Sequence, residues 1–293
     1  MVRRIVKDAL FFCSLMMMAA CGQTESDTVV IAPPVVMLTP DDPVLVTGGQ
    51  IRGAYSALAP GVMTFKGVPF AAAPTDELRW RPPAPVEPWS GVRDATTTGP
   101  MCIQERGGDV AQSENCLFLN VWAPDETSEL RPVMVWVHGG GYTGGSGSSS
   151  LYDGTSFASR NVVLVTINYR LNVFGFLAHP ALSAESGHEA SGNYGLMDMV
   201  ASLEWVRDNI ASFGGDPDRV TVFGESAGGG AVMSLMLMPQ AGGLFHGAIA
   251  QSNYINGWDR QLRESVGDWT SAEAQGIQLA EGVGASGETA LPV

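Results

Sequence analysis

Residues 220–230 read VTVFGESAGGG, and this segment does more than any other to define the architecture of the chain. Its first four residues are those of a buried strand, and residues 227–238 favour a helix. Between them lies the pattern Gly-x-Ser-x-Gly. Such a turn is too tight for side chains two positions from the serine. Gly224 and Gly228 avoid a clash with the backbone, so Ser226 projects from the sheet. The alternative is a structural serine in a glycine-rich turn.

Short apolar runs on both sides of this segment predict further strands of one sheet. They are β-branched, bounded by turn residues, and occupy residues 117–122, 133–137, 162–168 and 247–251. Residues 197–210 carry apolar side chains on one helical face. The alternating order of strands and helices predicts an α/β fold with a doubly wound, mostly parallel sheet.

The region before these strands has a different character. Residues 44–53 read VLVTGGQIRG and favour a small N-terminal antiparallel hairpin, with Gly48 and Gly49 between its two strands. Residues 66–100 are rich in proline, tryptophan and glycine, which indicates an ordered but irregular segment.

A run of glycines follows the strand at 133–137. Residues 138–142 read HGGGY, and glycines there let backbone N–H groups turn toward a substrate oxyanion. A glycine loop after a strand can instead hold phosphate. No Lys-Ser/Thr pair follows it and no G-x-G-x-x-G opens a helix, so a nucleotide site is disfavoured.

Several further motifs occur in a characteristic order along the chain. They are FKGVP at 65–69, RWRPP at 79–83, SENCLFLNV at 113–121, NYR at 168–170 and GNYGLMD at 192–198. With the glycine run and the Ser226 turn, they make the chain from Val44 onward resemble the type-B carboxylesterase or cholinesterase-like family. The resemblance implies the α/β-hydrolase fold.

The resemblance also implies the roles of the site residues. Ser226 is expected to be the nucleophile, and the backbone N–H groups of Gly140, Gly141 and Ala227 the oxyanion hole. Glu225 matches the acidic residue beside the nucleophile and is expected to tune the local field. The implied reaction is hydrolysis of a small-molecule carboxylic ester through an acyl-enzyme, with no cofactor. The alternative is a relative that has lost catalysis and serves as a binding or adhesion module.

The cysteines fit an exported protein. If Cys13 leaves with a signal peptide and Cys21 carries lipid, then Cys102 and Cys116 remain as a pair. A metal site is the alternative for paired cysteines, but no C-x-x-C and no clustered histidines accompany them. The resemblance matches these two cysteines to the first disulfide of the family.

Two structural ion pairs are implied by the resemblance, Arg79 with Glu114 and Arg170 with Asp198. The chain departs from the family pattern close to both pairs. Asn115 stands where the family usually has Asp, and Met199 stands where Gln often follows the aspartate. Neither change touches the expected reaction centre.

The N-terminus predicts export and anchoring. Residues 1–20 combine a basic start with a short apolar run, as a signal peptide does. Residues 18–22 read MAACG and resemble a bacterial lipoprotein processing box that ends in Cys21; an ordinary signal peptide with an incidental cysteine is the alternative. Residues 21–43 are expected to form a flexible tether, and 44–293 the hydrolase domain. The net charge of −14, without a basic cluster elsewhere, argues against nucleic-acid binding.

The histidines leave the general base unassigned. In this fold the triad acid and histidine follow the nucleophile, and the only histidine after Ser226 is His246. It lies before a strand, where the family has a surface or helix-end residue. His138 is expected to brace the glycine loop, and His179 and His188 to lie in a polar loop.

Family members are longer than this chain, so the resemblance implies that the C-terminal part of the fold, with the triad acid and histidine, is missing. The chain is expected to be the N-terminal portion of an active esterase or a shortened relative without catalysis. The first is favoured, because the apolar strand at 247–251 would otherwise form an open edge.

Overall fold

The computed structural model describes residues 35–105, 108, 110–253 and 260–285. The expected signal peptide and the lipidation site at Cys21 lie outside these residues. Among the described residues no helix is both long enough and apolar enough to cross a bilayer.

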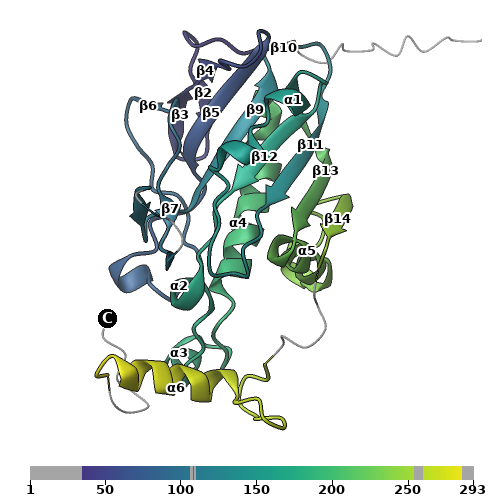
Figure 1. Cartoon of the computed structure of the whole chain (residues 1–293). Helices are drawn as coiled ribbons and strands as arrows, with labels where there is room; N and C mark the ends of the chain where they lie inside the picture. The colour runs from purple at the N-terminus through teal and green to yellow at the C-terminus, as the bar shows by residue number, and fades with distance from the viewer. Residues whose placement is uncertain (1–34, 106–107, 109, 254–259, 286–293) are drawn as a thin grey trace, which may run out of the picture. The chain divides into compact units, whose positions relative to one another are not determined.

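A seven-stranded sheet forms the centre of the domain, in the order β14-β13-β11-β12-β9-β5-β4 (Figure 1). Its strands are β4 (Ala54–Tyr55), β5 (Val62–Pro69), β9 (Phe118–Pro124), β11 (Arg131–Val137), β12 (Val163–Ile167), β13 (Gly215–Glu225) and β14 (Gly247–Gln251). The predicted α/β fold is confirmed, and all four predicted strands around the Ser226 segment are present.

The sheet is mixed. From β12 through β11 and β13 to β14 all neighbours are parallel, whereas β12, β9, β5 and β4 pair antiparallel. The parallel half carries the Ser226 segment. The expectation of a mostly parallel sheet did not foresee the antiparallel half, because a strand buried on both faces has the same apolar sequence in either direction.

Helices α1 (Thr155–Ala158), α4 (Tyr194–Asn209) and α5 (Ala227–Leu237) pack against the sheet. Helix α2 (Asn172–Phe176) packs on α4. Helices α3 (Pro180–Glu185) and α6 (Ala272–Gly282) lie beyond the end of the sheet, where the Ser183 hydroxyl donates to the Glu273 carboxylate (Figure 1). Short 3-10 turns are η1 (Asp76–Leu78), η3 (Ser150–Tyr152), η4 (Ile210–Phe213) and η5 (Pro239–Ala241).

The two faces of the sheet have separate cores. Alternate residues of β12 point to opposite faces. Val163 and Val165 lie in the main core with side chains of α4 and α5, whereas Leu164 packs in a smaller cluster with Trp122 and Ala158. The strand before Ser226, β13, and the helix after it, α5, both contribute side chains to the main core.

The predicted N-terminal hairpin is confirmed as β2 (Val44–Val46) paired antiparallel with β3 (Gly49–Arg52), and β6 (Val92–Asp94) adds a parallel strand to it. The irregular segment expected at 66–100 is wrong at its start, where residues 66–69 complete β5. A register shift between Phe65 and Val68 interrupts that strand, which explains why it lacks a regular pattern.

The tether expected over residues 21–43 is wrong for its last residues. Strand β1 (Val36–Met37) pairs with β10 (Glu126–Thr127), and the Leu38 N–H donates to the Asp125 carbonyl at 2.7 Å. Leu38 is only 3% exposed. The apolar patch that precedes Val44 thus belongs to the folded domain, because it buries a side chain in the main core.

Strand β14 is the edge of the sheet among the described residues. The side chain of Ile249 is 44% exposed there. The remaining short strands, β7 (Met101–Cys102) and β8 (Gln112–Ser113), pair with each other near the disulfide.

Candidate active site

Ser226 joins β13 to α5 in an unusual backbone conformation. Its φ is +56° and its ψ is −121°, a region that residues with a Cβ rarely occupy. The Ser226 N–H donates to the Gln251 carbonyl of β14 at 2.9 Å, and its own carbonyl accepts from the Gly230 N–H at 2.9 Å. Such a conformation costs on the order of 1–3 kcal/mol and persists only where the surroundings impose it.

Two glycines make this turn possible. A Cβ on Gly224 would lie 2.6 Å from the carbonyl oxygen of Gly228, and a Cβ on Gly228 would lie 2.1 Å from the carbonyl oxygen of Val137. Glycine is therefore required at both positions. The second contact is with β11, so the neighbouring strand constrains the turn as well.

The glycine run after β11 touches Ser226. A Cβ added to Gly139 would lie 3.2 Å from the Cβ of Ser226 and 2.6 Å from the Glu225 carbonyl oxygen. This contact follows from the sheet, because β11 and β13 are parallel neighbours whose carboxyl ends meet at one edge. We call residues 138–145 the glycine loop.

The donors of the glycine loop and of the turn are free to receive a ligand. Gly140 and Gly141 have φ of +116° and +65°, and the Gly140 carbonyl accepts from the N–H groups of Thr143 and Gly144. Within the part of the chain that the structure describes, the N–H groups of Gly140, Gly141 and Ala227 donate to no acceptor. The Ser226 hydroxyl likewise has no partner among the described residues.

His138 supports the glycine loop from inside. Its ring stacks on Tyr169 with centroids 4.3 Å apart, and its Nδ1 lies 2.9 Å from the Gly139 carbonyl oxygen. The Tyr169 hydroxyl donates to the His138 carbonyl at 2.8 Å. Burial lowers the pKa of His138 to about 4, so the ring is neutral at neutral pH.

This buried histidine predicts a stability that falls in mild acid. Because its folded pKa of about 4 lies below the unfolded value of 6.5, the unfolded state takes up a proton first as the pH drops. We expect the free energy of unfolding to fall between pH 6.5 and pH 4 by up to about 3 kcal/mol from this group. In His138→Asn, which keeps an amide donor toward Gly139, thermal denaturation should show a shallower pH slope over that range. An unchanged slope would contradict this assignment.

Aromatic side chains and an acid border the turn. Tyr142 packs its ring against Phe176, with centroids 5.0 Å apart, and its hydroxyl would lie 3.2 Å from a Cβ on Gly230. Burial raises the pKa of Tyr152, and the negative charge of the exposed Glu225 raises it further.

Comparison with known proteins places this geometry in a family. Residues 40–286 match the sequence profile of the Carboxylesterase family. The chain belongs to the carboxylesterase family. Its relatives include a fumonisin B1 esterase of Sphingopyxis macrogoltabida, 47% identical over 84% of this chain and 45% of the relative, and a para-nitrobenzyl esterase of Bacillus subtilis, 45% identical over 80% and 47%. The solved carboxylesterase EST55 of Geobacillus stearothermophilus is 48% identical over 71% of this chain and 42% of its own, with a TM-score of 0.65.

These relatives are carboxylic ester hydrolases. The chain spans about half the length of the curated relatives it matches.

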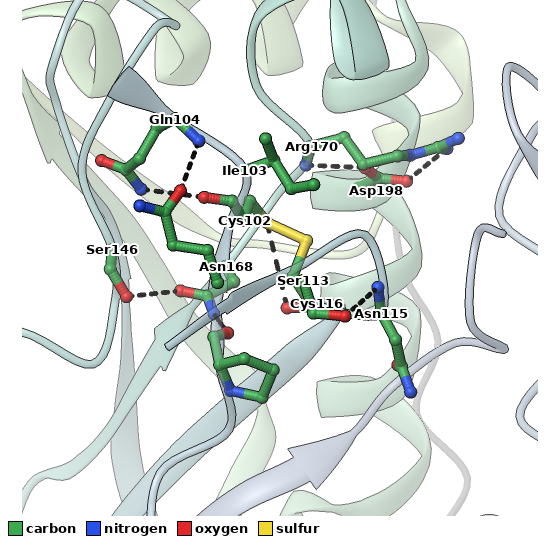
Figure 2. Close-up of a disulfide and its surroundings, with 12 residues drawn as sticks. Cys102, Ile103, Gln104, Ser113, Asn115, Cys116, Ser146, Asn168, Arg170 and Asp198 are labelled. Carbon is green, nitrogen blue, oxygen red and sulfur yellow. Dashed lines mark hydrogen bonds and ion pairs between the residues drawn. A yellow bond between two sulfur atoms is a disulfide. The ribbon is translucent and has the colours of Figure 1, made fainter. Parts of the chain in front are cut away.

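The carboxylesterase disulfide is present between Cys102 and Cys116, whose side chains are both buried (Figure 2). It closes a loop across 14 positions of sequence. Cross-linking a loop of this length stabilises a protein by on the order of 3 kcal/mol. Among the described residues no group of three potential metal ligands occurs.

The disulfide predicts a measurable redox effect on stability. Replacing both cysteines by serine should lower the free energy of unfolding by about 3 kcal/mol in urea denaturation. Adding a thiol reductant should then shift the unfolding midpoint of the wild-type protein but not that of the double variant. If the double variant unfolds at the wild-type midpoint, the cross-link contributes nothing to stability.

Both predicted ion pairs are present. Arg79 contacts Glu114 through two hydrogen bonds of 2.6 and 2.9 Å, and this contact raises the pKa of Arg79. Arg170 contacts Asp198 through side-chain bonds of 2.8 and 2.7 Å, and its backbone N–H donates to the same carboxylate at 3.0 Å. Figure 2 shows the second pair beside the disulfide.

A shallow recess lies beside the Arg79–Glu114 pair, Arg170 and the disulfide. Its other lining residues are Pro74, Ile103, Leu171 and Phe174. None of these residues belongs to the glycine loop or to the Ser226 turn. The recess therefore gives no reason to place ester chemistry there.

The other histidines do not reach Ser226. His246 accepts from the Val220 N–H at 3.3 Å, at the start of the segment that ends at Ser226. Val220 and Ser226 are six residues apart, which at about 3.3 Å per strand residue is roughly 20 Å. His188 is exposed, as expected for a polar loop.

His179 corrects a prediction. It was expected in a polar loop, but its side chain is fully buried and its Nδ1 accepts from the Ala181 N–H at 3.2 Å, which caps α3. Burial lowers its pKa. The proline that follows it is the local signal for a helix start.

Proposed function

We propose that this chain supplies the nucleophile and the oxyanion hole of a carboxylic ester hydrolase that works through a serine acyl-enzyme. The observation that carries the proposal is the strained backbone of Ser226, at φ +56° and ψ −121°, in contact with Gly139 of the glycine loop. A strained residue between a strand end and a helix start points to a functional site rather than to a packing need. Two of its relatives are named as esterases, which supports the proposal.

In the proposed reaction the Ser226 oxygen attacks the ester carbonyl carbon, and the carbonyl π electrons move onto the oxygen. The N–H groups of Gly140, Gly141 and Ala227 receive this oxyanion. Collapse of the tetrahedral intermediate breaks the bond to the alcohol and leaves an acyl-enzyme. Water then attacks the acyl carbon, and the acid departs with Ser226 restored.

The fixed donors are the main source of rate in this scheme. They are backbone groups, so they need no reorganisation when the charge develops. One of them, the Ala227 N–H, lies at the N-terminus of α5, where the helix dipole favours negative charge. Losing one such donor costs about 10²–10³ in turnover in comparable sites. Glu225, exposed at the turn, would modulate this field.

The proton of Ser226 needs a general base that also protonates the departing alcohol. His138 is buried with its Nδ1 directed at Gly139, and His246 contacts Val220, six residues before Ser226 in the chain. The proposal therefore places the base and its orienting acid outside the described residues. The substrate is a small-molecule carboxylic ester, with an amide or lipid ester as a variant of the same chemistry.

A fluorophosphonate probe tests the proposal on the full-length protein as its host makes it. The probe should label wild-type protein, and a peptide containing Ser226 should carry the label. Ser226→Ala should remain unlabelled. Equal labelling of the two proteins would remove Ser226 from the mechanism, and an unlabelled wild-type protein would favour a binding or adhesion module without catalysis.

We also propose that the protein is exported and held at a membrane by lipid on Cys21, after removal of residues 1–20. The support is the basic and apolar order of those residues and the small residues before Cys21. Cells fed an alkyne fatty acid should label the wild-type protein, and Cys21→Ser should lose the label and leave the membrane fraction. Labelling of Cys21→Ser at the wild-type level would reject the anchor.

A further inference from the structure

Gln104 links residues 102–104, which we call the disulfide segment, to the glycine loop. It follows Cys102 by two positions and is buried, with 7% of its surface exposed. Its Nε2 donates to the Gly145 carbonyl at 2.8 Å and to the Cys102 carbonyl at 3.1 Å, and its Oε1 accepts from the Gly145 N–H at 2.8 Å. One amide side chain thus satisfies both backbone groups of Gly145. Figure 2 shows Gln104 beside Cys102 and the disulfide.

Gly145 lies where it can control the start of the glycine loop. A Cβ on Gly145 would lie 2.4 Å from Nδ1 of His138 and 2.5 Å from the carbonyl oxygen of Gly139. The last residue of the loop therefore packs directly on its first two. Because no space separates them, the position of Gly145 fixes the path on which Gly140 and Gly141 lie.

A second amide repeats this link. Asn172, the first residue of α2, donates through its Nδ2 to the Ile103 carbonyl at 3.2 Å and to the Thr143 carbonyl at 3.1 Å. Its backbone N–H donates to the Tyr142 carbonyl at 2.9 Å. Two neighbouring residues of the disulfide segment, 103 and 104, are thereby tied to three residues of the glycine loop.

The disulfide segment is itself held in place. The Gln104 N–H donates to Oε1 of Gln112 at 2.7 Å, and the Cys102–Cys116 bond fixes the chain two residues earlier. The amide of Gln104 therefore projects from an anchored backbone toward a loop that contains few side chains of its own. A glycine-rich loop needs such external support because its backbone has wide conformational freedom.

We propose that Gln104, assisted by Asn172, is a positioning residue for the oxyanion hole. The inference rests on the proposed function of the glycine loop. Gln104 holds the loop by Gly145, and so keeps the N–H groups of Gly140 and Gly141 directed toward the carbonyl oxygen of an ester bound at Ser226. It acts through the loop and contacts no reacting atom.

The expected effect is on turnover more than on substrate binding. Oxyanion donors act on charge that develops in the transition state, so their misplacement lowers kcat and changes KM little. A displacement of about 1 Å at a reacting site costs on the order of 10²-fold in rate. We expect Gln104→Ala to lower kcat roughly 10- to 100-fold with a change in KM below about threefold.

Asn209 provides a matched control. It is also a buried amide, its Oδ1 accepts from the Thr47 N–H at 2.7 Å, and its Nδ2 donates to the Trp205 carbonyl at 2.8 Å. None of these bonds involves the glycine loop. Asn209→Ala should therefore lower stability as Gln104→Ala does while it leaves kcat within about twofold of wild type.

A charged variant gives a readout that a purely structural role would not move. Gln104→Glu keeps an acceptor for the Gly145 N–H but sets a carboxylate oxygen against the carbonyl oxygens of Gly145 and Cys102. Protonation of that carboxyl would restore a donor. The ratio of its kcat to that of wild type should therefore rise as the pH is lowered, whereas the ratio for Gln104→Ala should stay constant.

The experiment measures kcat and KM on a p-nitrophenyl ester for the full-length wild type, Gln104→Ala, Gln104→Glu, Asn209→Ala and Ser226→Ala. Hydrogen exchange of a peptide that covers residues 139–145 is measured in parallel. The proposal expects both faster exchange of this peptide and a loss of kcat in Gln104→Ala and, at neutral pH, in Gln104→Glu, and neither effect in Asn209→Ala. It is overturned if Gln104→Ala matches Asn209→Ala in both kcat and exchange.

The two hypotheses fail differently. If Ser226→Ala hydrolyses the ester at the wild-type rate, the proposed function is wrong, and hydrogen exchange alone then decides whether Gln104 holds the loop. If Ser226→Ala is inactive but Gln104→Ala keeps wild-type kcat, the function stands and the positioning role is rejected.

Discussion

Replacing Ser226 by glycine should abolish ester hydrolysis and at the same time make the protein more stable. Loss of a serine nucleophile lowers turnover on the order of 10⁶-fold in a comparable hydrolase. Glycine has no Cβ and adopts positive φ freely, so it relieves the strain at φ +56°. Strain of about 1–3 kcal/mol, less the entropy lost by fixing a glycine, leaves an expected gain of about 1 kcal/mol.

Ser226→Ala is the matched control, because it removes the hydroxyl but keeps the Cβ. It should be as inactive as Ser226→Gly and gain less stability. Urea denaturation of the three proteins, with ester hydrolysis on the same samples, makes the comparison. A glycine variant less stable than the alanine variant would show that the turn is unstrained, and the main support for the proposed function would fall.

Replacing Asp198 by asparagine should cost about 3–5 kcal/mol of stability, the usual result of removing one partner of a buried ion pair. The side chains of Arg170 and Asp198 are 3% and 0% exposed. The carboxylate accepts the Arg170 backbone N–H and two guanidinium N–H groups, while Nη1 of Arg170 has no partner among the described residues. The asparagine variant would bury a positive charge without compensation.

An exposed pair on α4 serves as the control. Asp208 contacts Arg207 at 2.7 Å with both side chains about half exposed. Asp208→Asn should therefore change the free energy of unfolding by less than about 1 kcal/mol. Chemical denaturation of both variants tests the contrast. Equal losses in the two would mean that burial of the Arg170 pair has no energetic consequence.

Local pattern was enough to predict the Ser226 turn. The strand residues, the two flanking glycines and the helix after them are contiguous, so each constrains the others within a few positions. The contact of the glycine loop with Ser226 also follows from sequence, since parallel neighbouring strands bring their carboxyl ends together.

Other features depend on long-range pairing and left no local signal. The antiparallel direction of β9 is set by its neighbours, β5 and β12, and its apolar sequence is the same in either direction. Leu38 appeared to belong to a tether because a two-residue strand has no period to detect. The bonds of Gln104 to Gly145 cross 41 positions of sequence, and a single glutamine after a cysteine carries no pattern.

The most direct test of the central claim is a crystal structure of the full-length protein after reaction with a fluorophosphonate. The account predicts phosphorus bonded to the Ser226 oxygen, with the phosphoryl oxygen about 2.7–3.1 Å from the backbone nitrogens of Gly140, Gly141 and Ala227. A phosphoryl oxygen directed away from those nitrogens, or phosphorus bonded to another residue, would contradict it.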